Sequence, residues 1–168
     1  AFNYKSQDAI DIFAEERVQE EVRKDYSYVF ARYQYPGIPK MRLNTIGDNN
    51  FTIGRLVLTP LRVYHYRLPI YGFRTGDFAY ITDANYIPEQ TKEKLYGVKH
   101  LVINALRKEK HISHFSLQEA IDIIREISPR KAYLTHISHQ MGLHREVSGT
   151  LPPGIMLAYD GLSFVCEE

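Results

Sequence analysis

Four polar residues lie where apolar stretches of the sequence end. His65 closes the run RLVLTPLRVYH, Asp83 closes FAYITD, His136 closes KAYLTH, and His114 lies in the loop HISHFS that follows HLVINAL. A strand holds its last side chain rigidly while the loop beyond leaves room for a substrate, so such positions favour catalysis and metal binding. Imidazole nitrogens and a carboxylate suit zinc, manganese or iron. The four residues indicate a metal site, provided that their strands lie side by side in one sheet.

Each of these residues also has a simpler explanation. A histidine at a strand end is more often a hydrogen-bonded surface or core residue than a metal ligand, and Asp83 in TDAN could cap a turn. The spacings are long, which suits a site assembled by a sheet but lacks the specificity of a compact motif such as H-E-x-x-H. The assignment therefore depends on the elements that hold the four residues.

The first half of the chain is expected to be rich in strands. Residues 9–16 predict a short strand and residues 16–33 a helix, because apolar residues recur there at helical spacing between charged ones. Residues 41–83 predict a meander of antiparallel strands, with a tight hairpin turn at Thr75–Asp77 that contains Gly76.

The second half predicts alternating helices and strands. Helices are expected over 88–97 and 116–127, the latter opened by a capping box of Ser116 and Glu119. Residues 100–106 and 131–136 read as buried strands, and residues 154–166 as a hairpin turning at Asp160-Gly161. A β meander followed by β-α-β units predicts a layered α/β sandwich, in a single domain over residues 1–168.

Composition narrows the function further. With 168 residues, 44% hydrophobic and 24% charged, the chain can build one core. The formal net charge of +1 predicts no strong electrostatic field that would attract a nucleic acid or a membrane surface. The only cysteine, Cys166, excludes an internal disulfide framework or a cysteine zinc cage and fits a reducing compartment. No stretch is apolar enough to span a bilayer, so we expect a cytoplasmic protein without a membrane partner.

Several stretches resemble the metallo-β-lactamase superfamily. They are HYRLPIYGFRTGDFAYITDANYIPE, LVINALRKEKHISHFSLQEAIDII and KAYLTHISHQMG with LPPGIMLAYDG, and the likeness runs from about Thr52 to Gly161. It is closest to the branch that contains the phosphoribosyl cyclic phosphodiesterase, with tRNA 3′-processing endonucleases as more distant relatives. The resemblance implies an αββα sandwich with two divalent metal ions, zinc or manganese, at one edge of the paired sheets.

The resemblance also implies a role for each residue at the strand ends. His65 looks like a ligand of the first metal, Asp83 like the carboxylate that bridges both metals, and His136 like a ligand of the second. His114 resembles the non-ligand histidine that protonates the leaving oxygen as a general acid. This is compatible with the chemistry, since an imidazole titrates near neutral pH and two metals can hold a hydroxide between them.

Three further residues are weaker candidates. Arg107 and His111 could bind the substrate phosphate, although a solvated loop residue is the simpler explanation for each. His139, one turn beyond His136, is expected to support the metal ligands from behind or to help cap the following segment.

The H-x-H-x-D-H motif that supplies most metal ligands in this family is absent, and no histidine precedes His65. Either the chain is a fragment, which its start at Ala1 favours, or it diverged without the motif. We expect the C-terminal two-thirds of the fold, an N-terminally incomplete sandwich. Such a chain should bind metal weakly, show little activity alone, and could form a homodimer through its exposed sheet edge.

The sequence thus predicts a metal-dependent hydrolase of a small cyclic or sugar phosphodiester. One alternative is a non-catalytic α/β module for binding or scaffolding. The other is a nuclease-type relative that acts on nucleic acid ends, against which the near-zero net charge counts.

Overall fold

The computed structural model describes residues 8–33 and 37–166, so the start at Ala1 lies outside the described part. The chain divides into two units, Ala1–Asn49 and Asn50–Glu168, and each is considered by itself. The single domain expected over residues 1–168 stays a prediction.

The first unit is a helix flanked by two paired strands. Strand β1 (Ile10–Ala14) pairs in parallel with β2 (Met41–Thr45), and α2 (Glu16–Asp25) with the 3-10 helix η1 (Ser27–Val29) lies between them in sequence. The early strand is confirmed, and so is the helix from Glu16, but it ends at Asp25, before the expected residue 33. The expectation that residues 41–46 open the antiparallel meander is wrong. A parallel pair needs a long crossover connection, and the helical segment between β1 and β2 supplies it.

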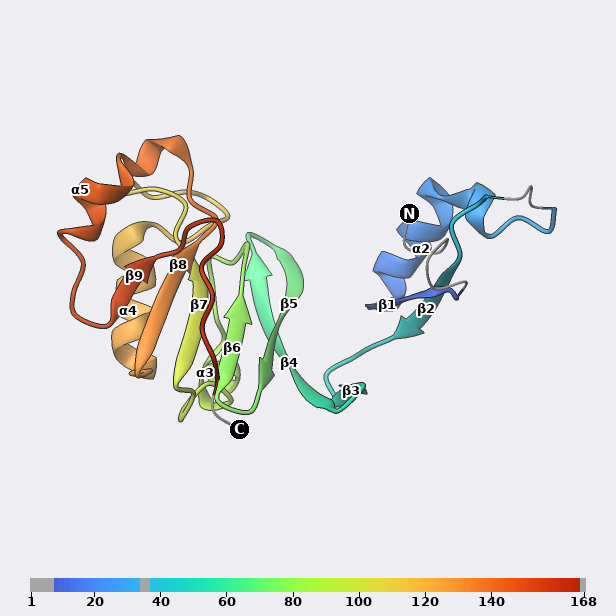
Figure 1. The fold of residues 1–168 in the computed structure, drawn as a ribbon, viewed down its shortest axis with the longest axis horizontal. Helices are drawn as coiled ribbons and strands as arrows, with labels where there is room; N and C mark the ends of the chain where they lie inside the picture. Colours follow the sequence, from blue (N-terminus) through green and yellow to red (C-terminus); the bar gives the residue numbers. More distant parts are fainter. Residues whose placement is uncertain (1–7, 34–36, 167–168) are drawn as a thin grey trace. The chain divides into compact units, whose positions relative to one another are not determined.

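The second unit contains a seven-stranded sheet in the order β3-β4-β5-β6-β7-β8-β9 (Figure 1). The strands are β3 (Phe51–Ile53), β4 (Leu56–His65), β5 (Leu68–Thr75), β6 (Phe78–Ile81), β7 (His100–Asn104), β8 (Lys131–Thr135) and β9 (Ile155–Leu157). Strands β3 to β6 form the expected meander, and Gly76 at φ 52° makes the turn between β5 and β6. From β6 onward all pairs are parallel.

Helices accompany the parallel half of this sheet. They are α3 (Glu89–Glu93), α4 (Leu117–Ile127), η2 (His139–Met141) and α5 (His144–Ser148). Helix α4 runs alongside β7 and β8 in Figure 1 and buries Ala120, Ile121, Ile124 and Ile127. These side chains join strand residues such as Leu61, Ile81, Ile103 and Leu134 in one apolar core. The sheet edge above this core is therefore rigidly supported.

None of the helices formed by the described residues has the length and apolar character that crossing a bilayer requires.

The C-terminal hairpin expected over residues 154–166 is wrong. Strand β9 pairs with β8 in parallel, and the chain does turn at Asp160–Gly161, but residues 158–166 form no returning strand. The segment is held by its side chains instead. The ring of Phe164 stacks on Tyr133, with 4.3 Å between centroids and 3° between planes. After the turn, this segment therefore packs against β8 through Phe164 and does not pair with β9 as a strand.

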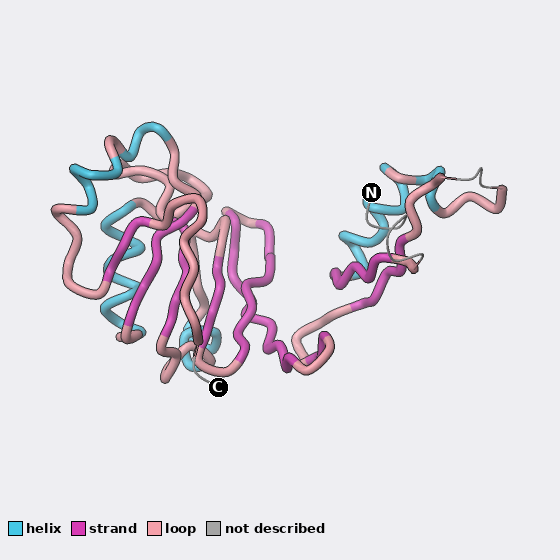
Figure 2. The backbone as a smooth tube through the Cα atoms, viewed as in Figure 1, coloured by secondary structure: helices cyan, strands magenta, loops and turns pink. Residues whose placement is uncertain are grey.

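The sheet topology brings four strand ends to one edge. Strand β4 is antiparallel to β5, and β5 is antiparallel to β6, so β4 runs in the same direction as β6, β7 and β8. The loops that leave these strands meet at the upper edge of the sheet in Figure 2. Residues directly after these strands therefore lie near one another, as at the carboxyl edge of other parallel sheets.

Candidate metal and catalytic site

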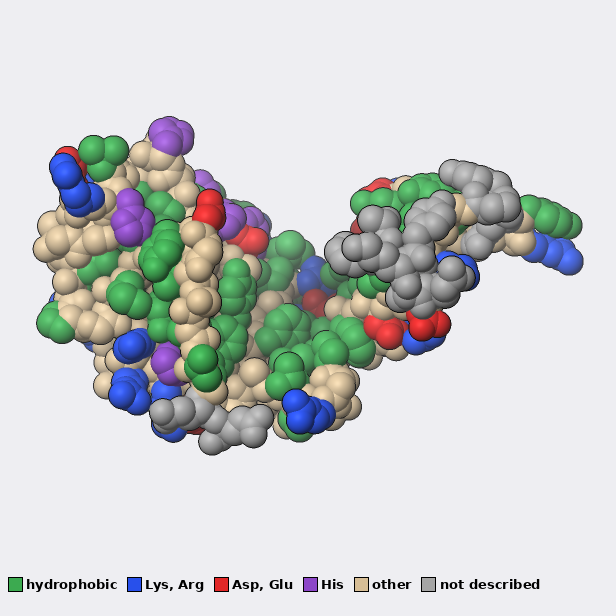
Figure 3. Space-filling view, viewed as in Figure 1, with side chains coloured by type: hydrophobic (Ala, Val, Ile, Leu, Met, Phe, Trp, Pro, Cys, Tyr) green, Lys and Arg blue, Asp and Glu red, His purple; other side chains and the backbone are tan. Residues whose placement is uncertain are grey.

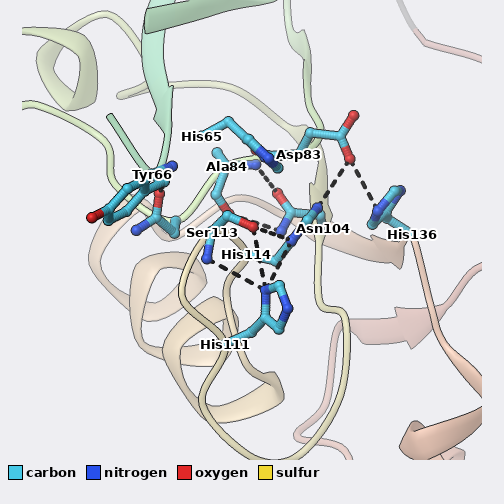
Figure 4. Close-up of polar contacts among 10 residues, drawn as sticks. His65, Tyr66, Asp83, Ala84, Asn104, His111, Ser113, His114 and His136 are labelled. Atoms are coloured by element: carbon cyan, nitrogen blue, oxygen red, sulfur yellow. Dashed lines mark hydrogen bonds and ion pairs between the residues drawn. The ribbon is translucent and has the colours of Figure 1, made fainter. Parts of the chain in front are cut away.

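The structure brings together all four residues that close the apolar stretches (Figure 4). Oδ1 of Asp83 lies 3.0 Å from Nε2 of His136 and 3.4 Å from Nε2 of His114. The His114 ring is stacked on that of His136 at 4.8 Å and meets that of His65 edge-on at the same centroid distance. Histidine and acidic side chains gather at this upper edge in the space-filling view of Figure 3. The arrangement is a cluster of imidazoles around one carboxylate.

The orientation of His65 follows from one hydrogen bond. Its Nδ1 lies 2.8 Å from the backbone carbonyl oxygen of Asp83. A carbonyl oxygen only accepts, so Nδ1 donates and the neutral ring keeps its lone pair on Nε2. Metal-binding histidines are usually fixed in this way, with one ring N–H donated to a carbonyl or carboxylate. Nε2 of His65 is therefore available as an acceptor, as a metal ligand would need.

Two of the candidate ligands have unusual backbones. Asp83 has φ 58° and His136 has φ 56°, in the left-handed region that non-glycine residues rarely adopt. Such conformations cost about 1–3 kcal/mol and occur mostly where the surrounding structure enforces them at functional sites. Both residues come directly after the sheet, where the chain must turn away while the side chain stays at the edge.

Asn104 enforces the turn at Asp83, and sequence analysis missed it. Its fully buried side chain accepts from the Ala84 N–H at 2.8 Å and donates to the Ala84 carbonyl at 2.9 Å. The available signal was one amide within the apolar run LVINAL, where a buried polar group must find partners.

The side chain of His114 is largely enclosed. Its side chain is 12% exposed, and its Nδ1 lies 3.1 Å from Nδ1 of His111 and 3.0 Å from Oγ of Ser113. Burial lowers the pKa of His114, and the neighbouring His136 and His65 add to the effect, while the carboxylate of Asp83 opposes it. The neutral imidazole is therefore favoured at neutral pH.

The donor atoms fit a divalent cation. One ligand atom from each of Asp83, His114 and His136 can be chosen so that all three lie within 4.8 Å of one another. Oδ1 of Asp83 is buried and faces the Nε2 atoms of His136 and His114, so a cation bound between these atoms would be shared by all three side chains. This geometric set contains His114 in place of His65, so the geometry alone allows His114 to be a ligand or a proton donor.

The weaker candidates have other contacts. Arg107 donates to Oε1 of Gln140 at 2.8 Å and to the Lys110 carbonyl at 2.9 Å, which ties two loops together. His111 lies behind His114, as its 3.1 Å contact shows. His139 is exposed and begins η2. The cap of this helix is Ser138, whose Oγ accepts from the Gln140 N–H, and the roles considered for His139 stay predictions.

Comparisons with known proteins agree with this fold. The family model of the β-lactamase superfamily domain matches residues 3–137. The crystal structure of a new diphosphatase from the PhnP family superposes with a TM-score of 0.86 at 29% identity, over 95% of this chain and 60% of that one. Zn(2+)-bound PqqB from Methylobacterium extorquens gives 0.67 at 16% identity, over 94% and 63% of the two chains.

Among curated proteins, an octanoyltransferase from Porphyromonas gingivalis (strain ATCC BAA-308 / W83) is 38% identical over 159 residues. That match covers 94% of this chain but only 32% of the relative, so the chain spans about a third of that protein. The family match covers most of the chain, and the structural neighbours share its α/β architecture. The chain therefore belongs to the β-lactamase superfamily and has the metallo-β-lactamase fold.

Proposed function

We propose that the chain forms part of the catalytic centre of a metal-dependent hydrolase that cleaves phosphodiester bonds, with a small cyclic or sugar phosphodiester as substrate. The observation that carries this proposal is the convergence of three imidazoles on the Asp83 carboxylate at one edge of the sheet. The similarity to a diphosphatase of the PhnP family supports phosphoryl chemistry over other hydrolytic reactions.

His65, Asp83 and His136 are the residues that would hold the divalent ions, zinc or manganese, of the whole protein. Bound there, such ions supply an activated water and neutralise charge on the phosphoryl oxygens. Catalytic zinc usually has three protein ligands for each ion. Three residues shared between two ions provide fewer, so we expect weak metal binding by the present chain and little turnover.

His114 is proposed as the general acid. In phosphodiester hydrolysis a water oxygen bonds to phosphorus, the bond from phosphorus to the leaving oxygen breaks, and the leaving oxygen takes a proton. Nε2 of His114 faces the same space as Asp83 and His136, so the protonated form of the ring, which the Asp83 carboxylate favours, would deliver this proton from Nε2. His111 and Ser113 contact Nδ1 on the far side of the ring and can hold the imidazole in place.

The proposal is tested by metal binding and hydrolysis together. Calorimetric titration with Mn²⁺ or Zn²⁺ should give weak binding that Asp83→Asn abolishes and His144→Gln leaves unchanged, because His144 lies outside the cluster and contacts the Leu157 carbonyl. Bis(4-nitrophenyl) phosphate should be hydrolysed slowly by this chain and faster by the longest natural protein. Equal metal binding by Asp83→Asn and the parent chain would contradict the proposal.

A second candidate is acyl chemistry, which the identity to the octanoyltransferase favours. Two thirds of that relative lie outside the matched stretch, so its named activity need not reside in the shared part. Hydrolysis of 4-nitrophenyl octanoate, compared with that of the phosphodiester, separates the two functions. A chain that cleaves neither substrate and binds no metal would instead be a binding or scaffold module.

A further inference from the structure

A hollow of about 550 Å³ opens directly beside the histidine cluster. Its lining consists of His65, Tyr66, Arg67, Leu68, Ile112 and Ser113. His65 thus belongs both to this hollow and to the candidate metal site, so a molecule bound in the hollow would lie next to the reacting group. The volume is in the range that small-molecule sites occupy.

Tyr66, one of the residues that line this hollow, adopts a strained backbone; Figure 4 shows its side chain beside the cluster. Its φ is 57°, and for a bulky aromatic residue the left-handed region is a genuine outlier. The strain is maintained by a 2.6 Å hydrogen bond from the Tyr66 N–H to Oδ1 of Asn85. Backbone strain of this kind concentrates at functional sites, where it fixes the direction of a side chain.

The same asparagine connects both walls of the hollow. Nδ2 of Asn85 donates to the carbonyl oxygen of Ile112 at 3.2 Å, on the loop that leads to His114. The backbone N–H of Asn85 donates to the Tyr64 carbonyl at 2.9 Å, next to His65. Asn85 therefore fixes the separation between the Tyr66 wall and the Ile112 wall.

The walls are apolar although they border a polar site. Tyr66 and Leu68 are each 48% exposed and Ile112 is 67% exposed. Arg67 provides the cationic group of this lining, with its guanidinium carbon 5.1 Å from the centre of the Tyr66 ring. Apolar walls with a single cation suit a cyclic organic group attached to an anion better than they suit inorganic phosphate.

We infer that this hollow binds the organic arm of the substrate, an aromatic or nucleoside-like ring that packs against Tyr66 while its phosphate lies at His65. The inference rests on the proposed phosphodiester chemistry for the position of the phosphate. Ring binding itself is measured by equilibrium titration and does not require turnover.

Two probes, phenyl phosphate and methyl phosphate, isolate the contribution of the ring. The parent chain should bind phenyl phosphate about 10-fold more tightly, because stacking on an aromatic side chain is commonly worth about 5- to 150-fold in affinity. Tyr66→Ala should reduce that ratio toward one, whereas Tyr66→Phe should preserve it. Tyr96→Ala is the matched control, since Tyr96 is 47% exposed and lies outside the hollow, and it should leave the ratio unchanged.

Strain gives an independent readout. Tyr66→Gly removes the ring and the left-handed penalty together, so it should raise Tm by about 2 °C while abolishing the preference for phenyl phosphate. An unchanged probe ratio in folded Tyr66→Ala, or equal affinity of the parent chain for both probes, overturns the inference. If the longest natural protein does not hydrolyse the phosphodiester but the chain still prefers phenyl phosphate, only the proposed function is contradicted.

Discussion

At the scale of single residues, Asn104 determines how Asp83 is presented. Its side chain is the partner of both backbone polar groups of Ala84. Replacing it by leucine would leave the buried Ala84 N–H unpaired, at about 1–3 kcal/mol, while the Ala84 carbonyl keeps its hydrogen bond from the Phe115 N–H. We expect Asn104→Leu to lower the free energy of unfolding in urea by roughly 1–3 kcal/mol. Asn50→Leu, at an exposed position, should change it little. Equal stability of the two variants would show that Asn104 is not required for the turn.

His114 can be assigned as a proton donor or a ligand by one comparison. As a general acid it should lose about 10²–10⁴-fold in kcat on substitution by glutamine, while the metal affinity of the longest natural protein stays unchanged. If His114 is instead a ligand, His114→Gln should lower the metal affinity of the protein as much as His136→Gln does. The measurement pairs metal titration with hydrolysis of bis(4-nitrophenyl) phosphate. A fall in metal affinity for His114→Gln would reject the proton-donor role.

The position of the candidate site could be predicted from residue types, but the backbone conformations and loop contacts that orient its side chains could not. His65, Asp83 and His136 were recognisable because each ends an apolar stretch, and parallel strands gather their ends at one edge. The left-handed backbones of Asp83 and His136 leave no trace in the sequence, because both residue types adopt ordinary conformations elsewhere. The tie between Asn85 and Ile112 likewise depends on loops that only the folded chain brings together.

At the scale of elements, α4 begins at a capping box that also responds to pH. Burial would raise the pKa of Glu119. Hydrogen bonds from the backbone N–H and the hydroxyl of Ser116, together with the charge of Lys110, lower it. The lowering effects are larger, so the pKa of Glu119 lies below its ordinary value. A carboxyl group with a lowered pKa in the folded state stabilises the protein above its unfolded pKa. That contribution is lost as pH falls through the folded pKa.

Glu119→Gln should therefore reduce the dependence of stability on acid pH. We expect the substitution to cost about 1 kcal/mol at pH 7, the size typical of a helix cap, and to cost less at acid pH, as the parent residue itself takes up a proton. Asp122→Asn on the same helix is the control, because its carboxylate is exposed. Thermal unfolding at acid pH and at pH 7 measures the difference, and an equal loss under both conditions would contradict the assignment.

Local signals predicted elements better than they predicted pairings. The capping box of α4 and the turn at Gly76 depend on neighbouring residues alone, so the sequence contained them in full. The partner of β2 and the path after β9 depend on distant segments. Strand β2 pairs with β1, from which a helix separates it in the sequence. Phe164 stacks on Tyr133 and does not form the second strand of the expected hairpin. Tertiary packing decided both cases, as it often does for strands.

At the scale of the whole molecule, the cluster joins parts of the second unit that are far apart in the sequence. Asp83 follows β6 and His136 follows β8, so one cation bound by Asp83, His114 and His136 would link two strands of the sheet and the loop of His114. A ligand that binds only the folded state stabilises it by mass action, by about 2.7 kcal/mol at 100 times its Kd.

Titration with Mn²⁺ or Zn²⁺ should therefore raise the Tm of the chain. For a domain of this size about 2.7 kcal/mol corresponds to roughly 5–10 °C, and a chelator should reverse the shift. Asp83→Asn should abolish the response, because it removes the carboxylate that His114 and His136 face, whereas His144→Gln should retain it. The comparison tests the metal site through stability alone. A shift of equal size in Asp83→Asn would place the binding ion elsewhere, at groups that do not connect these strand ends.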